Sequence, residues 1–321
     1  MNDNINTASP FEVKTANQWS KDAVKRADPV PLWGTLWFEN EMACLFADTN
    51  VGKSILAVQI ADQVAREGHR VLYLDFEMSD KQFQLRYSEE LRAKEDGATA
   101  EMTLHRFSEN FFRCQPSPEV ALGSMEQMIG SIESLIVQLE TPVVVIDNLT
   151  WICNAYESGD AAGELMQMLV RLKKYYDLSI LCVAHTPKRA IDTPLTQNTL
   201  AGSKRIANFM DSIFAIGIDR TREPRGRYIK QIKVRSAECL YGEDNVIRCD
   251  LEKQGSMLRF AETGFGHESD MLEEPAVRQS REILDDEIVS LLAQGKTYRE
   301  ITSMLKVSNK TVLAVKQRRN L

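Results

Sequence analysis

Two spacings of apolar residues alternate along most of the chain and predict its secondary structure. Runs of consecutive apolar residues are typical of strands buried in a parallel sheet, whereas apolar residues at every third or fourth position are typical of helices packed on one face. The predicted strands are residues 42–46, 70–76, 102–107, 143–147 and 178–184, and the predicted helices are residues 55–67, 81–91, 123–139 and 160–176. Because strands and helices alternate, the pattern predicts an α/β fold, namely a doubly wound and mainly parallel sheet with helices on both faces.

The pattern changes from residue 212 onward. Four further strands are predicted there, and because only short turns join them, they would extend the sheet in an antiparallel fashion. These strands are residues 212–218, 227–234, 245–251 and 257–260.

Differences in polarity along the chain predict the domain boundaries. The first residues are polar with little periodicity and would form a flexible arm with one short helix, and a polar, acidic stretch near residue 270 would form a linker. The predicted parts are an arm at residues 1–30, the α/β domain at 31–262, a linker at 263–281 and a small all-α domain at 282–321.

The composition is typical of a globular protein. Hydrophobic residues make up 43% and charged residues 26% of 321 residues, which suffices for one large and one small domain. No apolar run is long enough to span a bilayer and the first 21 residues are polar, so we expect neither a membrane partner nor a signal peptide. Six scattered cysteines without Cys-x-x-Cys spacing indicate reduced thiols and a cytoplasmic location. The net charge of −7 restricts any contact with nucleic acid to a local basic surface.

The segment between the first predicted strand and the first predicted helix has the pattern of a phosphate-binding loop. A loop of mostly small residues ends in Gly-Lys-Ser, after which the helical periodicity begins. Backbone N–H groups of such a loop surround nucleotide phosphates, the lysine reaches the β- and γ-phosphates, and the serine hydroxyl holds Mg²⁺. The pattern ordinarily starts with glycine, where this chain has alanine, and a chance Gly-Lys-Ser at a helix start is the alternative. The predicted nucleotide-binding residues are Ala47, Asp48, Thr49, Asn50, Val51, Gly52, Lys53, Ser54 and Ile55.

Three further polar residues follow or end predicted strands and would lie at the carboxyl edge of a parallel sheet, beside the loop. Asp147 can share Mg²⁺ with Ser54, and Glu77 can act as the general base that polarises the attacking water. A neutral His185 can hydrogen-bond the γ-phosphate and report its presence to the following segment. Each role has a simpler alternative, which is an acidic helix cap for Asp147, a surface acid for Glu77 and an ordinary strand end for His185.

Taken together, these segments resemble the RecA-like ATPases, and most closely the hexameric replicative helicases of plasmids and phages. The likeness is carried by residues 47–54, 74–79, 143–147 and 183–188 and extends over about residues 31–262. It implies ATP and Mg²⁺ as cofactors and a homo-oligomer in the form of a hexameric ring. It also implies that Glu77 is the catalytic glutamate, Asp147 the metal-site aspartate and His185 the sensor.

The same resemblance implies two further site elements. A Lys-x-Arg pair on a late strand of this family enters the neighbouring subunit's site, and Lys233 and Arg235 fit that pattern. Their charge would stabilise phosphoryl transfer as arginine fingers do, and the alternative is a pair of exposed residues on an edge strand. Arg86 falls near a family arginine at the nucleotide.

Two loops that leave the sheet just after site residues are candidates for contact with DNA inside such a ring. They are residues 154–163 and residues 187–203, the second of which carries Lys188 and Arg189. Because both follow site residues, the state of the nucleotide can move them. Ordinary solvated loops are the alternative, because basic residues are sparse in both.

The last forty residues predict three helices with helix-turn-helix spacing. Thr297 and Glu300 form a capping box for the second helix and Ser308 caps the third. The segment resembles the helix-turn-helix units that end sigma factors and response regulators. Residues 301–321 contain five basic residues and no acidic residue, as a helix in a DNA groove requires; a unit that docks on protein is the alternative. The predicted DNA contacts are Asn309, Lys310, Thr311, Lys316 and Arg318.

From these patterns we expect an oligomeric, Mg²⁺-dependent ATP hydrolase that acts on DNA, namely a helicase-like replication protein of a mobile element. Two alternatives stay open. In the first, ATP binding gates a DNA-binding switch that does not unwind DNA. In the second, the ATPase docks on another replication protein.

Overall fold

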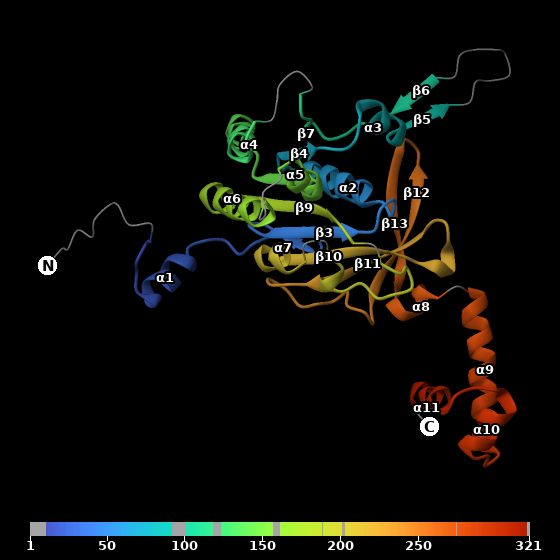
Figure 1. Cartoon of the computed structure of the whole chain (residues 1–321). Coiled ribbons are helices and arrows are strands. Elements are labelled where there is room, and N and C mark those ends of the chain that lie inside the picture. Colours follow the sequence, from blue (N-terminus) through green and yellow to red (C-terminus); the bar gives the residue numbers. More distant parts are fainter. Residues whose placement is uncertain are drawn as a thin grey trace.

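A nine-stranded sheet forms the centre of the computed structural model, which describes residues 11–91, 101–117, 123–156, 161–187, 189–200, 203–273 and 275–319 (Figure 1). The strand order is β13-β12-β11-β10-β3-β9-β8-β4-β7. These strands are β3 Met42–Ala47, β4 Val71–Asp75, β7 Phe111–Cys114, β8 Val143–Asp147, β9 Ser179–His185, β10 Ser212–Ile218, β11 Gly226–Lys233, β12 Val246–Gln254 and β13 Met257–Gly266.

Six neighbouring strands, from β10 to β7, run parallel, so their carboxyl ends meet at one edge of the sheet. Ala47 at the end of β3 lies opposite His185 at the end of β9, and Asp75 at the end of β4 lies opposite Asp147 at the end of β8. All residues of β4 and β8 are buried, as expected for parallel strands covered on both faces. The strands predicted at 42–46, 70–76, 143–147 and 178–184 are therefore confirmed as parallel, and the register brings the predicted site residues together. The strand predicted at 102–107 corresponds to β6 Glu101–Leu104, which pairs antiparallel in a separate two-stranded sheet.

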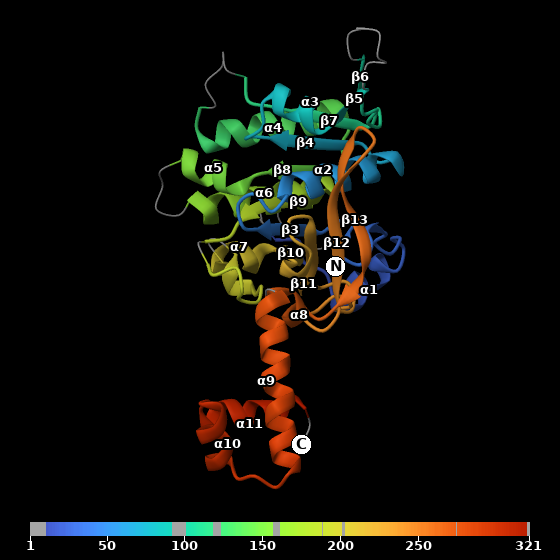
Figure 2. The same cartoon turned by 90° about the vertical axis from the view of Figure 1, so that its right-hand side faces the viewer.

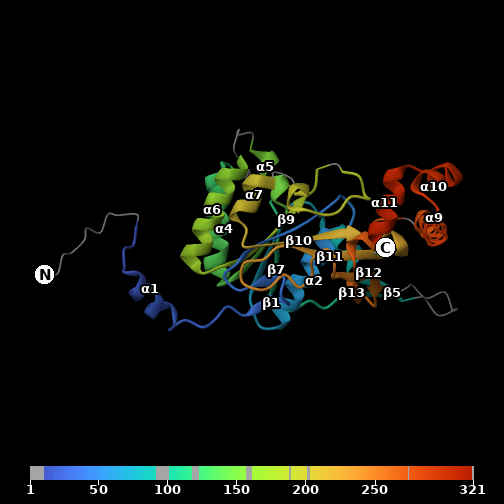
Figure 3. The same cartoon turned by 90° about the horizontal axis from the view of Figure 1, so that it is seen from below.

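Helices cover both faces of this sheet, and the view from below separates the two layers (Figure 3). Alternate residues of β8 show the division, because Val144 packs in the same cluster as helices α4 and α6 whereas Val145 packs with α2 on the other face. The predicted doubly wound, mainly parallel α/β sheet is confirmed. The helices of this domain are α2 Lys53–Arg66, α3 Asp80–Arg86, α4 Met125–Leu139, α5 Leu149–Ala155, α6 Ala161–Tyr176 and α7 Ser203–Phe209.

The antiparallel extension is confirmed for β11, β12 and β13, with β13 longer than predicted, whereas β10 pairs antiparallel with β11 but parallel with β3. The β12–β13 hairpin rises alongside the parallel strands and packs on α2 (Figure 2). The Gln59 side chain fixes it there, because its Nε2 donates to the Phe260 carbonyl at 3.0 Å and its Oε1 accepts from the Phe260 N–H at 2.7 Å. The hairpin thereby forms one wall beside the phosphate loop.

The range 263–281, predicted as a linker, is regular structure instead. It contains the end of β13, α8 Glu268–Leu272 and the first turns of α9 Pro275–Ala293. Glu268 explains the difference, because its side chain is buried and lies 2.5 Å from Nζ of the buried Lys230. A polar, acidic sequence does not reveal that one of its carboxylates is paired inside the fold.

Short elements account for the other differences from prediction. Helix α3 is shorter than the helix predicted at 81–91, and β5 Ser88–Leu91 follows it and pairs with β6 Glu101–Leu104. β7, α5 and α7 had no predicted counterpart, because elements of four to seven residues show too little periodicity. The predicted loop 154–163 begins in α5 and ends in α6, and residues 157–160 lie outside the described part of the chain.

The N-terminal segment adds a short helix, α1 Ala16–Ala23, none of whose residues is buried. A small antiparallel pair follows, formed by β1 Pro31–Trp33 and β2 Trp37–Phe38. Trp37 is fully buried and the Trp33 ring lies 5.5 Å from the Phe214 ring, so both indoles belong to the core of the sheet domain. Among the described helices, none combines the length and the apolar character that crossing a bilayer requires.

Three helices form a C-terminal unit that projects from the sheet domain along α9 (Figures 1 and 2). The other two are α10 Tyr298–Leu305 and α11 Asn309–Arg318. The predicted caps are confirmed: Thr297 and Glu300 form a capping box at α10, and the Ser308 hydroxyl accepts from the Thr311 N–H at 3.1 Å. The small core of this unit consists of Ile288, Ile301, Val312 and Val315.

Candidate active site

The phosphate loop connects β3 to α2 with two residues in the left-handed backbone region. Asn50 has φ of +63° and Gly52, the N-cap of α2, has φ of +113°. Asparagine tolerates this region better than other side chains, and at Gly52 a β-carbon would also lie 2.9 Å from the Phe260 ring. Ala47 occupies the position where the pattern ordinarily has glycine, but it ends β3 in regular register with His185 and without a positive φ. The loop therefore does not require glycine at that position.

The Lys53 side chain folds back over the loop and is almost completely buried. Its Nζ donates to the carbonyls of Ala47 at 3.1 Å and Asp48 at 3.0 Å. Burial lowers the pKa of Lys53, while the nearby carboxylates of Asp147, Glu77 and Asp48 oppose this shift. A buried ammonium group thus stands at the mouth of the loop with only backbone carbonyls as hydrogen-bond acceptors in the described part of the chain.

Asp147 ends β8 and is buried beside Ser54. Its Oδ2 accepts from the Tyr73 hydroxyl at 2.7 Å, whereas the buried Oδ1 has no hydrogen-bond partner among the described residues. Burial raises the pKa of Asp147 to about 6, against the smaller lowering effects of the Tyr73 and Ser54 hydroxyls. A buried carboxylate oxygen without a partner, next to a serine hydroxyl, fits a divalent cation bound between them.

The chemistry of these donors also limits the kind of cation. No group of three or more His, Cys, Asp or Glu side chains suited to a metal ion occurs within the described ranges. A cation at Ser54 and Asp147 would therefore complete its shell with water and phosphate oxygens. Mg²⁺ is ordinarily bound in that way, by one or two protein oxygens together with a nucleotide.

Glu77 lies with Asn148 and His185 in a cluster of polar side chains. The Asn148 Nδ2 is 2.5 Å from Glu77 Oε1 and 3.2 Å from His185 Nε2, and these last two atoms are 3.5 Å apart. The Asn148 Oδ1 accepts from the Trp151 N–H at 2.8 Å, which fixes the amide with its nitrogen toward the other two side chains. Because an amide nitrogen only donates, it holds Nε2 of His185 as an acceptor. Burial and the Lys53 charge also lower the pKa of His185, so the ring is neutral.

Asn148 was not predicted from the sequence. The available signal was its position directly after Asp147, where an Asn at a strand end that opens a helix is a good N-cap. Glu77 has a second support: the Asp75 Oδ1 accepts from the N–H groups of Glu77 at 3.1 Å and Met78 at 2.9 Å. Arg113 in turn lies 2.9 Å from the Asp75 carboxylate. The turn after β4 is therefore held in place by side chains from two strands.

A pocket opens over the loop and is lined by most of the predicted nucleotide-binding residues. Arg86 is one of them, and its guanidinium lies 2.9 Å from the Met78 sulfur. Leu251 of β12 was not predicted as part of the site and adds an apolar wall. The lining residues are Thr49, Asn50, Gly52, Lys53, Ser54, Ile55, Glu77, Arg86, His185 and Leu251.

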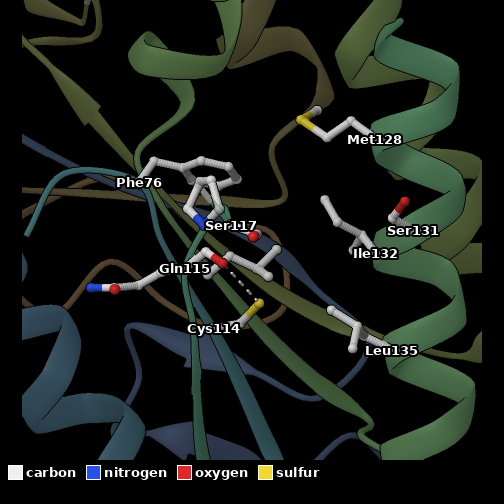
Figure 4. A pocket seen from close by; sticks show the side chains of 10 residues that line it. Phe76, Cys114, Gln115, Ser117, Met128, Ser131, Ile132 and Leu135 are labelled. Atoms are coloured by element: carbon white, nitrogen blue, oxygen red, sulfur yellow. Dashed lines mark hydrogen bonds between the residues drawn. The ribbon is translucent and has the colours of Figure 1, made fainter. Parts of the chain in front are cut away.

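A second pocket lies between α4 and the ends of β4 and β7 (Figure 4). Phe76, Met128, Ile132 and Leu135 give it an apolar lining, and Cys114 is the one titratable side chain that it presents. Burial raises the pKa of this thiol. The pocket therefore lacks the charged groups that phosphate chemistry needs.

The structure places Arg189 against the phosphate loop. Its guanidinium lies 3.0 Å from the Asp48 carboxylate, which also accepts from the Thr186 hydroxyl, and its side chain is only 10% exposed. The predicted DNA contact at Arg189 stays a prediction, and in the structure its guanidinium is engaged in a partly buried ion pair. Lys188 lies outside the described residues.

Lys233 and Arg235 lie at the opposite edge of the sheet from Lys53. Lys233 Nζ donates to the carbonyls of Ala207 at 3.0 Å and Met210 at 2.6 Å, and burial lowers its pKa. Arg235 lies 2.6 Å from Asp211, whose backbone N–H bonds to the first residue of β3. These two residues therefore do not reach the phosphate loop of their own chain.

In the C-terminal unit, the predicted DNA contacts divide by exposure. Asn309 and Lys310 are exposed, whereas Thr311 and Lys316 are half-buried. The Thr311 hydroxyl lies 2.9 Å from the Ser308 hydroxyl and so belongs to the cap. The side chain of Arg318 lies outside the described residues.

The comparison with known families identifies the class of this site. The AAA domain family matches residues 7–190, more than half of the chain, and the chain therefore belongs to that family. The matched range contains the phosphate loop, Glu77, Asp147 and His185, and it ends before β10 and the C-terminal unit. Membership supports a nucleotide-binding domain of the P-loop, RecA-like ATPase kind. No curated protein matches the chain.

Proposed function

We propose that this protein is a Mg²⁺-dependent ATP hydrolase that acts on DNA as an oligomer. The observation that carries the proposal is the meeting of Lys53, the unpaired oxygen of Asp147 and the Glu77–Asn148–His185 cluster at one edge of the sheet. These groups support the proposal, because phosphoryl transfer from a nucleotide uses a phosphate-binding lysine, a metal-site carboxylate and a group that orients the attacking water. The cytoplasm, where nucleotide and reduced thiols are available, is the proposed location.

The loop and Lys53 would bind the triphosphate. The N–H groups at the start of α2 and the Lys53 ammonium group offer positive charge to the phosphates. Ser54 and Asp147 would hold Mg²⁺, which when bound neutralises charge on the phosphate oxygens. Binding would also give the Asp147 Oδ1 the partner that it lacks within the described structure.

Glu77 would take the proton of the attacking water. The Asn148 amide orients the Glu77 carboxylate. The neutral His185 beside Asn148 can hydrogen-bond the terminal phosphate without adding charge. Because Asn148 opens α5 as its N-cap, a shift of this cluster on hydrolysis would reach the segment that follows.

The oligomeric part of the proposal rests on Arg235 and Lys233. Arg235 is exposed and lies at the edge of the sheet away from its own loop, as a residue that enters a neighbour's site would be. Lys233 would first have to leave the carbonyls at the end of α7. A hexameric ring is the assembly that the resemblance to replicative helicases implies, and helicase activity in replication of a mobile element is proposed on the same ground.

The DNA part rests on the C-terminal unit, where α10, a short turn and α11 have the order of a helix-turn-helix. Among the described residues of 301–319, Lys306 and Lys310 are exposed and no acidic residue occurs. Such a basic end on an acidic protein is suited to a local contact with phosphates.

A second candidate is an ATP-gated DNA-binding switch without unwinding activity. A series of contacts favours it. Arg189 pairs with Asp48 of the phosphate loop, and the segment that contains Arg189 continues to Leu195. The Leu195 N–H donates to Glu268 of α8 at 2.8 Å. Helix α8 leads directly into α9 and the C-terminal unit. A change at the phosphate loop would thus have a short physical route to the helices proposed to bind DNA.

The test is the rate of ATP hydrolysis without DNA, with single strands and with duplex, together with the mass of the protein with and without nucleotide. Glu77→Gln should lower the rate by about 10² to 10⁴-fold while ATP binding persists, and the exposed Glu238→Gln should not change it. Stimulation by DNA with strand separation would support the motor, and slow hydrolysis with nucleotide-dependent duplex binding would support the switch. A Glu77→Gln variant that still hydrolyses ATP at the original rate would refute the assigned base.

A further inference from the structure

Helix α11 presents one exposed face, which consists of two amide side chains, a lysine and a leucine. Among the described side chains of this helix, four are exposed, namely Asn309, Lys310, Leu313 and Gln317, whereas Val312 and Val315 are buried in the core of the unit. At about 100° per residue, the four exposed positions fall within roughly one quarter to one third of the helix circumference. The face is therefore a continuous surface that no described part of the chain covers.

Charge indicates which kind of partner fits this face. Lys306 precedes the helix and Lys310 lies at one margin of the face, and both are exposed. The acidic residues of the unit lie on α9 and at the start of α10, and Asp286 of α9 pairs with Arg319 at 2.7 Å. The α11 side of the unit thus complements a polyanion, while the α9 side does not.

The three remaining side chains of the face are those that recognise adenine and thymine. Asn and Gln side chains bind the N6 and N7 edge of adenine in the major groove, and an apolar side chain contacts the thymine methyl group. Among the described side chains of this face, none is arginine, and Lys310 is the one that could instead contact guanine. Asn309 and Gln317 are eight residues apart, which is about 12 Å along the helix and corresponds to roughly four base pairs.

We propose that α11 enters the major groove of duplex DNA and reads a short run of A·T pairs, with Asn309 and Gln317 on adenine and Leu313 on thymine methyl groups. Lys306 and Lys310 contact phosphates and fix the register. This inference rests on the DNA part of the proposed function and gives it a specificity that a purely electrostatic contact would not have.

The test uses the full chain and a pool of duplexes with a randomised central window. Bound duplexes are recovered and sequenced, and the best sequence is then remade with uracil in place of thymine, which removes only the C5 methyl group. We expect enrichment of A·T pairs and about fourfold weaker binding of the uracil duplex, from the loss of one buried methyl contact. Leu313→Ala should bind the thymine and uracil duplexes equally.

Further variants separate base contacts from phosphate contacts. Asn309→Ala and Gln317→Ala should weaken the selected duplex about tenfold and a scrambled G·C duplex little, whereas Lys310→Ala should weaken both alike. Gln279→Ala, which removes an exposed glutamine of α9, is the matched control. Because all these side chains are exposed, thermal unfolding followed by circular dichroism should be unchanged.

Two results would overturn the proposal in distinguishable ways. If duplexes bind without A·T enrichment, or if uracil weakens the wild type and Leu313→Ala equally, the reading face is refuted while the proposed DNA contact stands. If no duplex is retained even at low salt, the DNA part of the proposed function fails as well. In that case α11 would be assigned to contact with protein.

Discussion

At the carboxyl edge of the sheet, Lys53, Asp147 and Asn148 are each less than one-tenth exposed, whereas on α11 Asn309 and Gln317 are open to solvent. The first group is assembled from strands far apart in the sequence, and the register of the sheet sets its geometry. The second group comes from ten consecutive residues and depends on one helix and its cap.

This difference separates two ways in which polar residues perform a function. At the sheet edge, the fold holds buried charges in place, and burial disfavours their charged forms. On α11, exposed side chains carry no such penalty, and water satisfies them until a partner binds. Substitutions at the first region should therefore alter stability and catalysis together, whereas substitutions on α11 should alter binding alone.

The largest expected effect is at Glu268, where the sheet domain passes into the C-terminal unit. Its carboxylate accepts from Lys230, from the Tyr228 hydroxyl at 2.9 Å and from the Leu195 N–H. Glu268→Ala leaves the buried Lys230 without its counter-charge and should lower the free energy of unfolding of the sheet domain by about 3–5 kcal/mol. Urea unfolding followed by tryptophan fluorescence measures this loss.

Glu262→Ala is the matched control, because Glu262 is exposed on the preceding strand β13. It should change the unfolding free energy by less than about 0.5 kcal/mol. A loss at Glu268→Ala no larger than that of the control would mean that the buried pair does not stabilise the junction. The boundary between the sheet domain and the C-terminal unit could then not be drawn at this pair.

The next effect is a gain in stability at Asp147. Because burial raises the pKa of this carboxyl to about 6 from an ordinary 3.8, the charged form is disfavoured in the folded protein without ligand. Asp147→Asn should raise the free energy of unfolding by at most about 3 kcal/mol above pH 6. The gain should shrink as the pH falls through 6, since the native carboxyl then takes up a proton, and vanish below about 4.

The same variant should lose Mg²⁺-dependent hydrolysis, so stability and activity would change in opposite directions. Thermal unfolding without nucleotide between pH 4 and pH 8 gives the first quantity and the rate of phosphate release gives the second. Asp75→Asn is a useful comparison, because Arg113 pairs with that buried carboxylate and the substitution should destabilise the protein instead. A destabilised Asp147→Asn variant would contradict the inference that burial of this carboxylate lowers the stability of the folded protein.

Much of the sheet domain could be predicted from the sequence, because the information lies in consecutive residues. The apolar runs of β3, β4, β8 and β9 each end at a polar residue or loop, and parallel strands must bring those ends to one edge. This suffices to place Lys53, Glu77, Asp147 and His185 together. The caps at Thr297 and Ser308 are equally local and were equally predictable.

The remainder depends on pairs that the sequence separates. Asp48 and Arg189 are 141 positions apart, and Lys230 and Glu268 are 38 apart, so no local pattern distinguishes them from solvated charges. The ion pair of Arg189 was therefore not predicted, and the second pair explains why residues 263–281 were predicted as a linker although they are regular structure. Asn148 was missed for a different reason, since a good N-cap residue has a sufficient local role that conceals its contact with Glu77.

The smallest expected effect distinguishes the two regions most directly. Ser308→Ala removes the hydroxyl that accepts from the Thr311 N–H, and should destabilise the C-terminal unit by about 1 kcal/mol. Among its described residues the core of this unit has four fully buried hydrophobic side chains, so the loss should appear as faster hydrogen exchange along α11. Ser303→Ala, which replaces an exposed serine inside α10, is the matched control and should leave exchange unchanged.

The rate of ATP hydrolysis without DNA should be the same in both variants, because the sheet domain has its own core. A lower rate in Ser308→Ala alone would show that order in α11 reaches the phosphate loop, and the two regions would then have to be treated as one cooperative unit.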